Sequence, residues 1–195
     1  MRKNNNNNII RTCGYVITCI LSVQFIFGGQ LNRTSGLYDL DEDGRKEVLI
    51  INGSDRKVLL VELKDESFND TLWSYTLPAG TYFTDVLVID IDSNGQPDLV
   101  ATSKLSIENK NTGWLYIFKG TTSGFSNYPL VAGKSGLDFK NIRPLNLSRV
   151  KGKPNHISVS FGTPVRKTLV LKPNISNDRL SIDNVQTLSE PLIEN

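Results

Sequence analysis

The sequence predicts an all-β fold built from about three similar units of four antiparallel strands each. Three observations support this class. Short runs rich in β-branched and aromatic residues recur along the chain and are separated by Gly, Pro, Asn and Asp. No segment keeps an apolar stripe of helical period long enough to predict a helix. An acidic segment near the start of the chain returns about 50 residues later, as in a repeat protein.

The repeat is clearest in two acidic segments. YDLDEDGRKEVLI occupies residues 38–50 and IDIDSNGQPDLVA occupies residues 89–101, so that Gly44 and Gly95 lie 51 residues apart. A weaker copy, LNLSRVKGKPNHISVS, spans residues 145–160 and aligns if one residue is inserted. A period of this length suits a propeller blade or a similar β unit and is too long for the common helical repeats. We therefore expect units at residues 36–84, 85–137 and 138–195.

Strand-like runs follow one another in a similar order within the units. In the middle unit, DVLVIDI precedes the acidic segment, and PDLVATS, GWLYIFKG and the weaker NYPLVAG follow it. The first unit offers KEVLIIN, KVLLVEL and LWSYTL, and the third offers HISVSFG, TLVLK and LSIDNVQTL. These runs have the composition of strands. Four strands per unit are therefore expected.

The acidic segments place oxygen-bearing residues at alternate positions around a glycine. Counted from the first aspartate, the first copy has carboxylates at positions 1, 3, 5 and 9, and the second has carboxylates at 1, 3 and 9 and an asparagine at 5. Position 6 is Gly in both, which permits a sharp turn, and position 7 can offer its backbone carbonyl. The predicted ligand residues are Asp39, Asp41, Asp43, Arg45 and Glu47 in the first copy and Asp90, Asp92, Asn94, Gln96 and Asp98 in the second.

Carboxylates placed this closely need a counter-charge. Two of them about 5 Å apart repel by about 3 kcal/mol at an effective dielectric constant of about 20. Hard oxygen ligands at this spacing suit Ca²⁺, whereas the soft ligands that favour Zn²⁺ or Cu are missing from the motif. An EF-hand would need a Glu at position 12 and flanking helices, but that position is Ile50 or Ala101, each in a strand-like run.

The alternative interpretation is a pair of solvated acidic turns, because Asp and Asn are common in turns for local reasons. The duplication of the pattern favours metal binding. The first copy has more carboxylates and is expected to attract Ca²⁺ more strongly, provided that the longer Glu47 fits. The third copy offers Asn146 and Ser148, followed by basic residues, and is expected to bind no metal.

The segments VLVIDIDSNGQPDLVAT and YDLDEDGRKEVLIING resemble the FG-GAP/VCBS repeats of integrin-α-type β-propellers. In that family the D-x-D-x-D-G-x-x-D loop joins the first two strands of a blade and holds structural Ca²⁺. The resemblance implies this role for the carboxylates and Asn94 of the two copies, with Glu47 in place of the usual Asp. It covers most of residues 36–160, and in the third unit FGTP (161–164) is only a faint echo.

A complete propeller has four to eight blades, and this chain has about three units. Three explanations remain open at this stage. The chain is a fragment of a longer protein, it assembles with copies of itself or with a partner that supplies further blades, or it forms an open stack with exposed edges.

The N-terminus has the features of an export signal, which predicts a secreted or cell-surface protein. MRK is basic, a run of Asn follows, and the apolar stretch from Cys13 to Phe27 is short for a spanning helix. Residues 1–29 are thus either a signal peptide, cut after Gly28 or Gly29, or an uncleaved membrane anchor. Both cysteines of the chain lie in this segment, so a mature chain would have no disulfide.

Charge and motifs exclude several function classes. Three basic residues lie in the first 30, and the remainder has one more acidic than basic side chain, so nucleic acid and anionic membranes are not expected partners. The only histidine, His156, lies in a strand-like run, and the common hydrolase and phosphate-binding motifs are missing from the sequence. We expect aromatic residues such as Trp114, Tyr116 and Phe118 to line one face of a strand in the core.

The sequence therefore predicts an exported, non-enzymatic, Ca²⁺-binding repeat module for adhesion or for binding a protein or glycan ligand. One alternative is the propeller portion of a larger secreted polysaccharide-active or lipase-type enzyme. Another is a structural surface protein anchored by an uncleaved N-terminal segment. The identity of the ligand cannot be inferred from the fold, because propeller function depends on variable loops.

Overall fold

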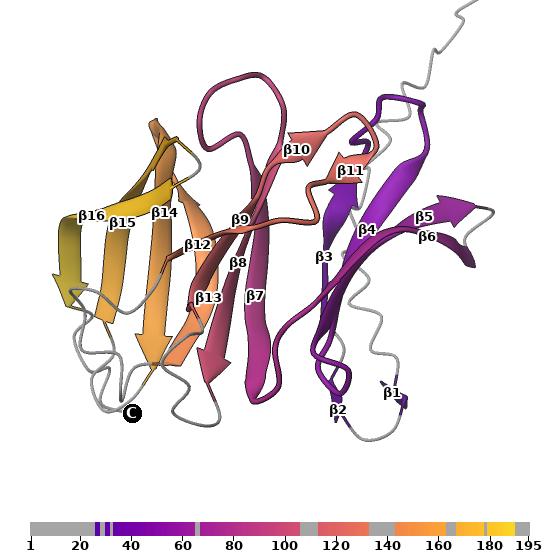
Figure 1. The fold of residues 1–195 in the computed structure, drawn as a ribbon, viewed down its shortest axis with the longest axis horizontal. Coiled ribbons are helices and arrows are strands. Elements are labelled where there is room, and N and C mark those ends of the chain that lie inside the picture. Colours follow the sequence, from indigo (N-terminus) through magenta and orange to yellow (C-terminus); the bar gives the residue numbers. More distant parts are fainter. Residues whose placement is uncertain are drawn as a thin grey trace, which may run out of the picture.

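The computed structural model describes residues 26–27, 30–31, 33–64, 67–105, 113–132, 143–162, 167–177 and 179–189. Within these residues the fold is all-β, as predicted, and contains no helix. Three four-stranded antiparallel sheets account for most of it (Figure 1). They are consistent with propeller blades, so the predicted fold class is confirmed.

Each sheet is an antiparallel meander whose strands pair in chain order. Sheet 1 contains β3 (Arg33–Tyr38), β4 (Lys46–Asn52), β5 (Lys57–Lys64) and β6 (Ser67–Thr76). Sheet 2 contains β7 (Thr81–Ile89), β8 (Asp98–Leu105), β9 (Leu115–Phe118) and β12 (Leu130–Ala132). Sheet 3 contains β13 (Arg143–Val150), β14 (Lys153–Gly162), β15 (Lys167–Ser176) and β16 (Arg179–Ser189).

Two short hairpins accompany the sheets. β1 (Ile26–Phe27) pairs with β2 (Gln30–Leu31), and β10 (Gly120–Thr121) pairs with β11 (Gly124–Phe125). The second hairpin interrupts sheet 2 between β9 and β12, and its two-residue strands are too short to be predicted from composition. It places Phe125 in the core, with 4% of its surface exposed.

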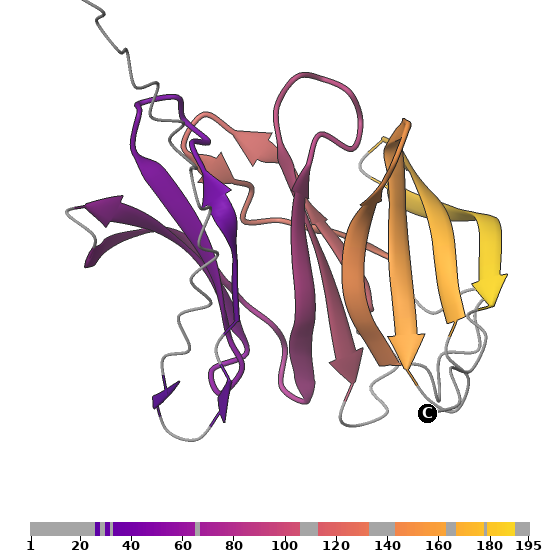
Figure 2. The ribbon, with the colours of Figure 1, turned by 180° about the vertical axis from the view of Figure 1, so that it is seen from behind.

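Sheet 2 lies between the other two sheets, as the front and back views show (Figures 1 and 2). Its side chains alternate between two hydrophobic clusters. Leu99 on β8 packs in the cluster shared with sheet 1, whereas its neighbour Val100 packs in the cluster shared with sheet 3. All four residues of β9 are buried. Burial on both faces explains why this unit reads as continuous apolar runs and not as an alternating pattern.

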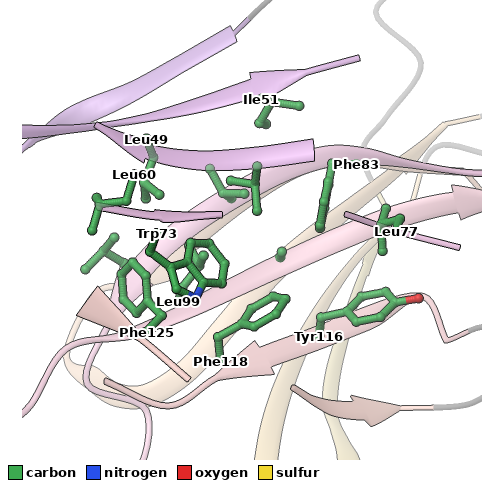
Figure 3. Close-up of a cluster of buried hydrophobic side chains, with 14 residues drawn as sticks. Leu49, Ile51, Leu60, Trp73, Leu77, Phe83, Leu99, Tyr116, Phe118 and Phe125 are labelled. Atoms are coloured by element: carbon green, nitrogen blue, oxygen red, sulfur yellow. The ribbon is translucent and has the colours of Figure 1, made fainter. Parts of the chain in front are cut away.

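Aromatic side chains fill the cluster between sheets 1 and 2 (Figure 3). Trp73 makes edge contacts with Phe118 and Phe125, with ring centroids 5.1 and 5.4 Å apart, and Tyr116 lies 6.4 Å from Phe118. The expectation that these aromatics serve packing is thus confirmed. Trp114 corrects one detail, because it precedes the first residue of β9 and packs 5.8 Å from Phe161 in the other cluster.

The predicted runs correspond to strands of the three sheets, with two differences. β3 has no predicted counterpart, and Asn146 and Ser148 of the weak third copy lie inside β13, paired with residues of β14, and not in a loop. β13 and β14 meet in a tight turn instead, with Val150 opposite Lys153. The third copy therefore has no loop comparable to the acidic ones.

Of the predicted N-terminal signal or anchor, residues 1–25, 28 and 29 lie outside the described part of the chain. In the part that is described, no helix is both long enough and apolar enough to span a membrane. Export, cleavage and anchoring therefore stay predictions.

Candidate metal centres in two acidic loops

The two acidic segments occupy equivalent places in sheets 1 and 2. Loop 1 (residues 39–47) leads from β3 into β4, and loop 2 (residues 90–98) leads from β7 into β8. The last residue of each loop is already in the second strand: Tyr38 pairs with Glu47, and Ile89 pairs with Asp98. Position 9 is thus fixed by the sheet ladder, while positions 1 to 7 are free to curl over it.

The loops share one backbone conformation. The residue at position 4 has a positive φ in both, 59° at Glu42 and 60° at Ser93, and so has the glycine at position 6, 86° at Gly44 and 88° at Gly95. A Cβ added at either glycine would meet nothing within 4 Å. The glycines are therefore needed for their left-handed conformation and not for space.

Three hydrogen bonds recur at the same positions. The position-2 amide donates to the position-9 carboxylate, from Leu40 to Glu47 Oε2 at 2.6 Å in loop 1. In loop 2 the amide of Ile91 donates to Asp98 Oδ2 at 3.2 Å. The glycine amide donates to the position-1 aspartate, at 3.4 Å in loop 1 and 2.9 Å in loop 2. The position-7 amide donates to the position-5 side chain at 2.8 and 2.7 Å. The same local forces thus shape both loops.

Carboxylate oxygens from three residues of each loop lie within 4.8 Å of one another. The residues are Asp39, Asp41 and Asp43 in loop 1 and Asp90, Asp92 and Asp98 in loop 2. Glu47 is not part of the first trio. The other predicted ligands, Arg45, Asn94 and Gln96, occupy positions 7, 5 and 7, where they take part in the recurring hydrogen bonds.

The position-9 carboxylates are buried beneath the loops. Glu47 is 1% exposed and Asp98 is 0% exposed, unlike the exposed aspartates at position 3. Burial raises the pKa of Glu47, although the hydrogen bond from Leu40 opposes the shift. Burial also raises the pKa of Asp98, against the amide of Gly120 and the charge of Lys119. Each loop therefore covers a carboxylate that is costly to ionise without a nearby cation.

The donor set of loop 1 fits a hard cation. Among the described residues, Oε1 of Glu47 is a buried oxygen with no hydrogen-bond partner, and buried polar atoms in proteins nearly always have one. Carboxylate and amide oxygens are the ligands that Ca²⁺ prefers. The trio of aspartates together with the buried glutamate is therefore compatible with a bound metal ion.

Two residues outside the loop motif face the position-9 carboxylates from the next strand. In sheet 1, Glu62 pairs with Glu47 across β4 and β5 and accepts two hydrogen bonds from Arg45, at 3.1 and 3.0 Å. In sheet 2, Lys119 directly follows the pair of Phe118 with Leu99, which brings it opposite Asp98. Its Nζ donates to Asp92 Oδ2 and lies 3.4 Å from Asp98 Oδ2.

Sequence reasoning missed both residues, because they follow the loops by 15 and 21 residues and only the strand register brings them near. Lys119 also affects the loop electrostatically. Burial is the largest single influence on Asp92 and opposes its ionisation. The hydrogen bond and charge of Lys119, together with hydrogen bonds from Asn94 and Asp90, nevertheless lower the pKa of Asp92. Loop 1 has two more exposed counterparts: Lys46 Nζ lies 3.4 Å from Asp39 Oδ2, and Arg45 Nε lies 3.5 Å from Asp43 Oδ2.

Loop 2 is also connected to sheet 3. Ser93 Oγ donates to the side-chain oxygen of Asn155 on β14 at 2.7 Å. Nearby, the Arg149 side chain of β13 donates to the carbonyl of Val88 on β7 at 2.7 Å. The conformation of this loop is therefore coupled to the interface between sheets 2 and 3.

Comparison with known proteins agrees with this geometry. Residues 39–101 match the family model described as FG-GAP-like repeat, and no curated protein matches the chain. The matched region begins at the first aspartate of loop 1 and ends in β8, just after loop 2. The resemblance seen in the sequence is thus confirmed for this region. Residues 39–101, with both acidic loops, are an FG-GAP-like repeat segment.

Proposed function

We propose that this chain is an exported, calcium-binding FG-GAP repeat module that binds a protein or glycan ligand and catalyses no reaction. The observation that carries the proposal is the repeated loop geometry. In each loop three carboxylates converge and the position-9 carboxylate is buried. This buried group is a fourth carboxylate in loop 1 and one of the three in loop 2. Calcium would neutralise the mutual repulsion of these groups, and the acidic side chains of the two loops would hold it.

A structural role for the metal follows from where the loops lie. Each loop connects the first two strands of a sheet, and a cation that binds the folded state alone stabilises it by mass action. At a hundredfold excess over its dissociation constant, one such ion adds about 2.7 kcal/mol. Rigid loops would in turn fix the sheet edges on which a ligand could dock.

The non-enzymatic character of the proposal is supported by the distribution of acidic groups. Among the described residues, the clusters of three or more groups that could hold a metal are those of the two loops. Carboxylates engaged with a metal are not free for acid–base catalysis, which in glycosidases needs a pair of carboxyl groups that face the substrate.

The first prediction concerns calcium and thermal stability. Millimolar Ca²⁺ should raise the melting temperature of the chain by several degrees over its value in chelator, since the ion binds the folded state alone. The combined substitution Asp41→Ala and Asp92→Ala should abolish this rise. Differential scanning calorimetry measures both, and Asp70→Ala, an exposed carboxylate outside the loops, serves as the control.

A melting temperature that is the same with Ca²⁺ and with chelator would contradict the calcium-binding part of the proposal. The binding role is tested separately, by applying the exported protein to a glycan array with and without Ca²⁺ and by assaying the bound glycans for cleavage. Cleavage of a bound glycan would favour the enzyme alternative.

A further inference from the structure

Lys119 occupies, in sheet 2, the place that Glu62 occupies in sheet 1. Each residue stands on the third strand of its sheet or just beyond it, opposite the buried position-9 carboxylate of the loop. The same site in the two sheets therefore faces opposite charges. Beside loop 1 stands a carboxylate that is itself paired with Arg45, whereas beside loop 2 stands an ammonium group. The cations that contact the loop 1 aspartates, Arg45 and Lys46, are more exposed than Lys119 and contact positions 5 and 1, whereas Lys119 contacts the buried position-9 carboxylate.

The ammonium group of Lys119 lies among the groups that would bind a metal. Its Nζ contacts one oxygen of Asp92 and one of Asp98, two of the three carboxylates that converge in loop 2. A calcium ion would coordinate the same oxygens at about 2.3–2.6 Å. Two cations cannot share these oxygens at such distances without strong repulsion.

The two position-9 carboxylates differ in whether both of their oxygens have a hydrogen-bond partner. Both oxygens of Asp98 have partners, because Oδ1 accepts from the Gly120 amide at 2.9 Å and Oδ2 accepts from Ile91 and Lys119. Oε1 of Glu47 has none among the described residues. The buried carboxylate of loop 2 is thus already compensated within the protein, whereas that of loop 1 is not.

Only the side chain of Lys119 would have to move to clear the site. Its carbonyl accepts a hydrogen bond from the amide of Ser126 at 2.8 Å, and the following amide, of Gly120, is held by Asp98. The side chain itself is 28% exposed and therefore reaches solvent. A flexible side chain on a fixed backbone can leave the loop without disturbing the sheet.

We propose that Lys119 is a built-in cation of loop 2 that competes with calcium, so that loop 1 fills first and loop 2 fills only when Lys119 swings out. This inference rests on the proposed function, in which both loops bind calcium. It explains a difference in Ca²⁺ affinity between the two loops by the position of Lys119, in addition to the number of carboxylates in each loop.

The test is a calorimetric Ca²⁺ titration of the full chain with loop 1 silenced by Asp41→Ala. If Lys119 leaves the site open about one tenth of the time, the apparent dissociation constant of loop 2 is about tenfold above its intrinsic value. Lys119→Met, which keeps the length and the apolar stem, should therefore tighten Ca²⁺ binding about tenfold. The matched control Lys172→Met changes an exposed lysine of sheet 3 and should change nothing.

A second variant transfers the device to the other sheet. With loop 2 silenced by Asp92→Ala, Glu62→Lys should weaken Ca²⁺ binding at loop 1 by a similar factor. This variant still tests the proposal if Lys119→Met does not fold. Unchanged affinities in both variants, with Ca²⁺ still bound at loop 1, would overturn the role of Lys119 and leave the proposed function standing. If the unmodified chain binds Ca²⁺ at neither loop, both the proposed function and the role of Lys119 are overturned.

Discussion

At the scale of single residues, Glu47 is the feature that links the stability of the chain to its proposed metal. It stands where loop 2 has the shorter Asp98 and is buried beneath loop 1. One of its oxygens accepts from Leu40, and the other has no partner among the described residues. A carboxyl group whose pKa is raised in the folded state lowers the free energy of unfolding at every pH above its unfolded value. Its charge is therefore a cost that a bound cation would offset.

Glu47→Gln should accordingly have opposite effects with and without metal. In chelator at neutral pH, the variant should be as stable as the unmodified chain or more stable by about 1 kcal/mol, because a buried charge is removed while an oxygen remains to accept from Leu40. In Ca²⁺ it should gain less stability than the unmodified chain does. Urea denaturation under both conditions measures this, and a loss of stability in chelator would show that the charge is already compensated.

The position-9 residues also show what a sequence can and cannot reveal at this scale. Their place in the motif, and the need for glycine at position 6, could be predicted because both depend on local spacing. The residues that face them, Glu62 and Lys119, could not, because they come from other strands and their approach depends on register. The charge balance of each loop is thus a tertiary property.

At the scale of elements, the strands were predictable where composition alone decides them. Runs such as KVLLVEL and HISVSFG lie in β5 and β14. β3, which contains RTSGLY, has few β-formers and is held by its pairing with β4. The short β10 and β11 strands likewise depend on their hairpin and on the burial of Phe125. Tertiary contacts override local preference in these elements.

Two glycines near sheet 2, one in loop 2 and one in β10, separate the need for a left-handed backbone from the need for space. Gly95 has a φ of 88° and open space around it, whereas a Cβ at Gly120 would lie 2.3 Å from the carbonyl oxygen of Pro97. Gly95→Ala should lower the free energy of unfolding by about 1–2 kcal/mol through backbone strain. Gly120→Ala should cost more, because Pro97 or β10 must shift.

Urea denaturation in chelator compares the two glycine variants without a contribution from calcium. Gly44→Ala in loop 1, with a φ of 86° and equally open surroundings, is the matched control for Gly95→Ala and should show a similar loss. An equal loss of unfolding free energy in Gly95→Ala and Gly120→Ala would contradict this. It would mean that the β10 hairpin can move away from Pro97 at little cost.

At the scale of the whole molecule, sheet 2 stabilises both of its neighbours. Phe118 belongs to the cluster shared with sheet 1 and Ile117 to the cluster shared with sheet 3, and both are 0% exposed. Adjacent residues of one strand thus anchor different interfaces. Three units could be predicted from the sequence. That the middle unit is the one buried on both faces follows only from its packing between the other two sheets.

Core substitutions in β9 should therefore destabilise the molecule from either face. Ile117→Ala should lower the free energy of unfolding by about 2–5 kcal/mol and Phe118→Ala by about 3–5 kcal/mol. Leu37→Ala, at a side chain that is 64% exposed, should change it by less than about 0.5 kcal/mol. Chemical denaturation followed by tryptophan fluorescence reports on both interfaces, because Trp73 and Trp114 lie on opposite sides of sheet 2.

Two separate transitions in these experiments, one for each tryptophan environment, would contradict the cooperative coupling through sheet 2. A single transition shifted by both β9 substitutions is the expected result. The hydrogen bond from Ser93 to Asn155 adds a polar link to the same interface.

The two apolar faces of sheet 2 also bear on how such a chain can grow. A unit that offers one face to each neighbour can be copied in tandem, because every inserted copy meets a complementary surface on both sides. A copy that keeps the acidic loop, as two of the three sheets do, can then differ in the residue opposite position 9, which is a carboxylate at Glu62 and an ammonium group at Lys119. If the two loops bind calcium as proposed, duplication of one gene segment would give a row of cation sites, and a single residue on a neighbouring strand would set the affinity of each.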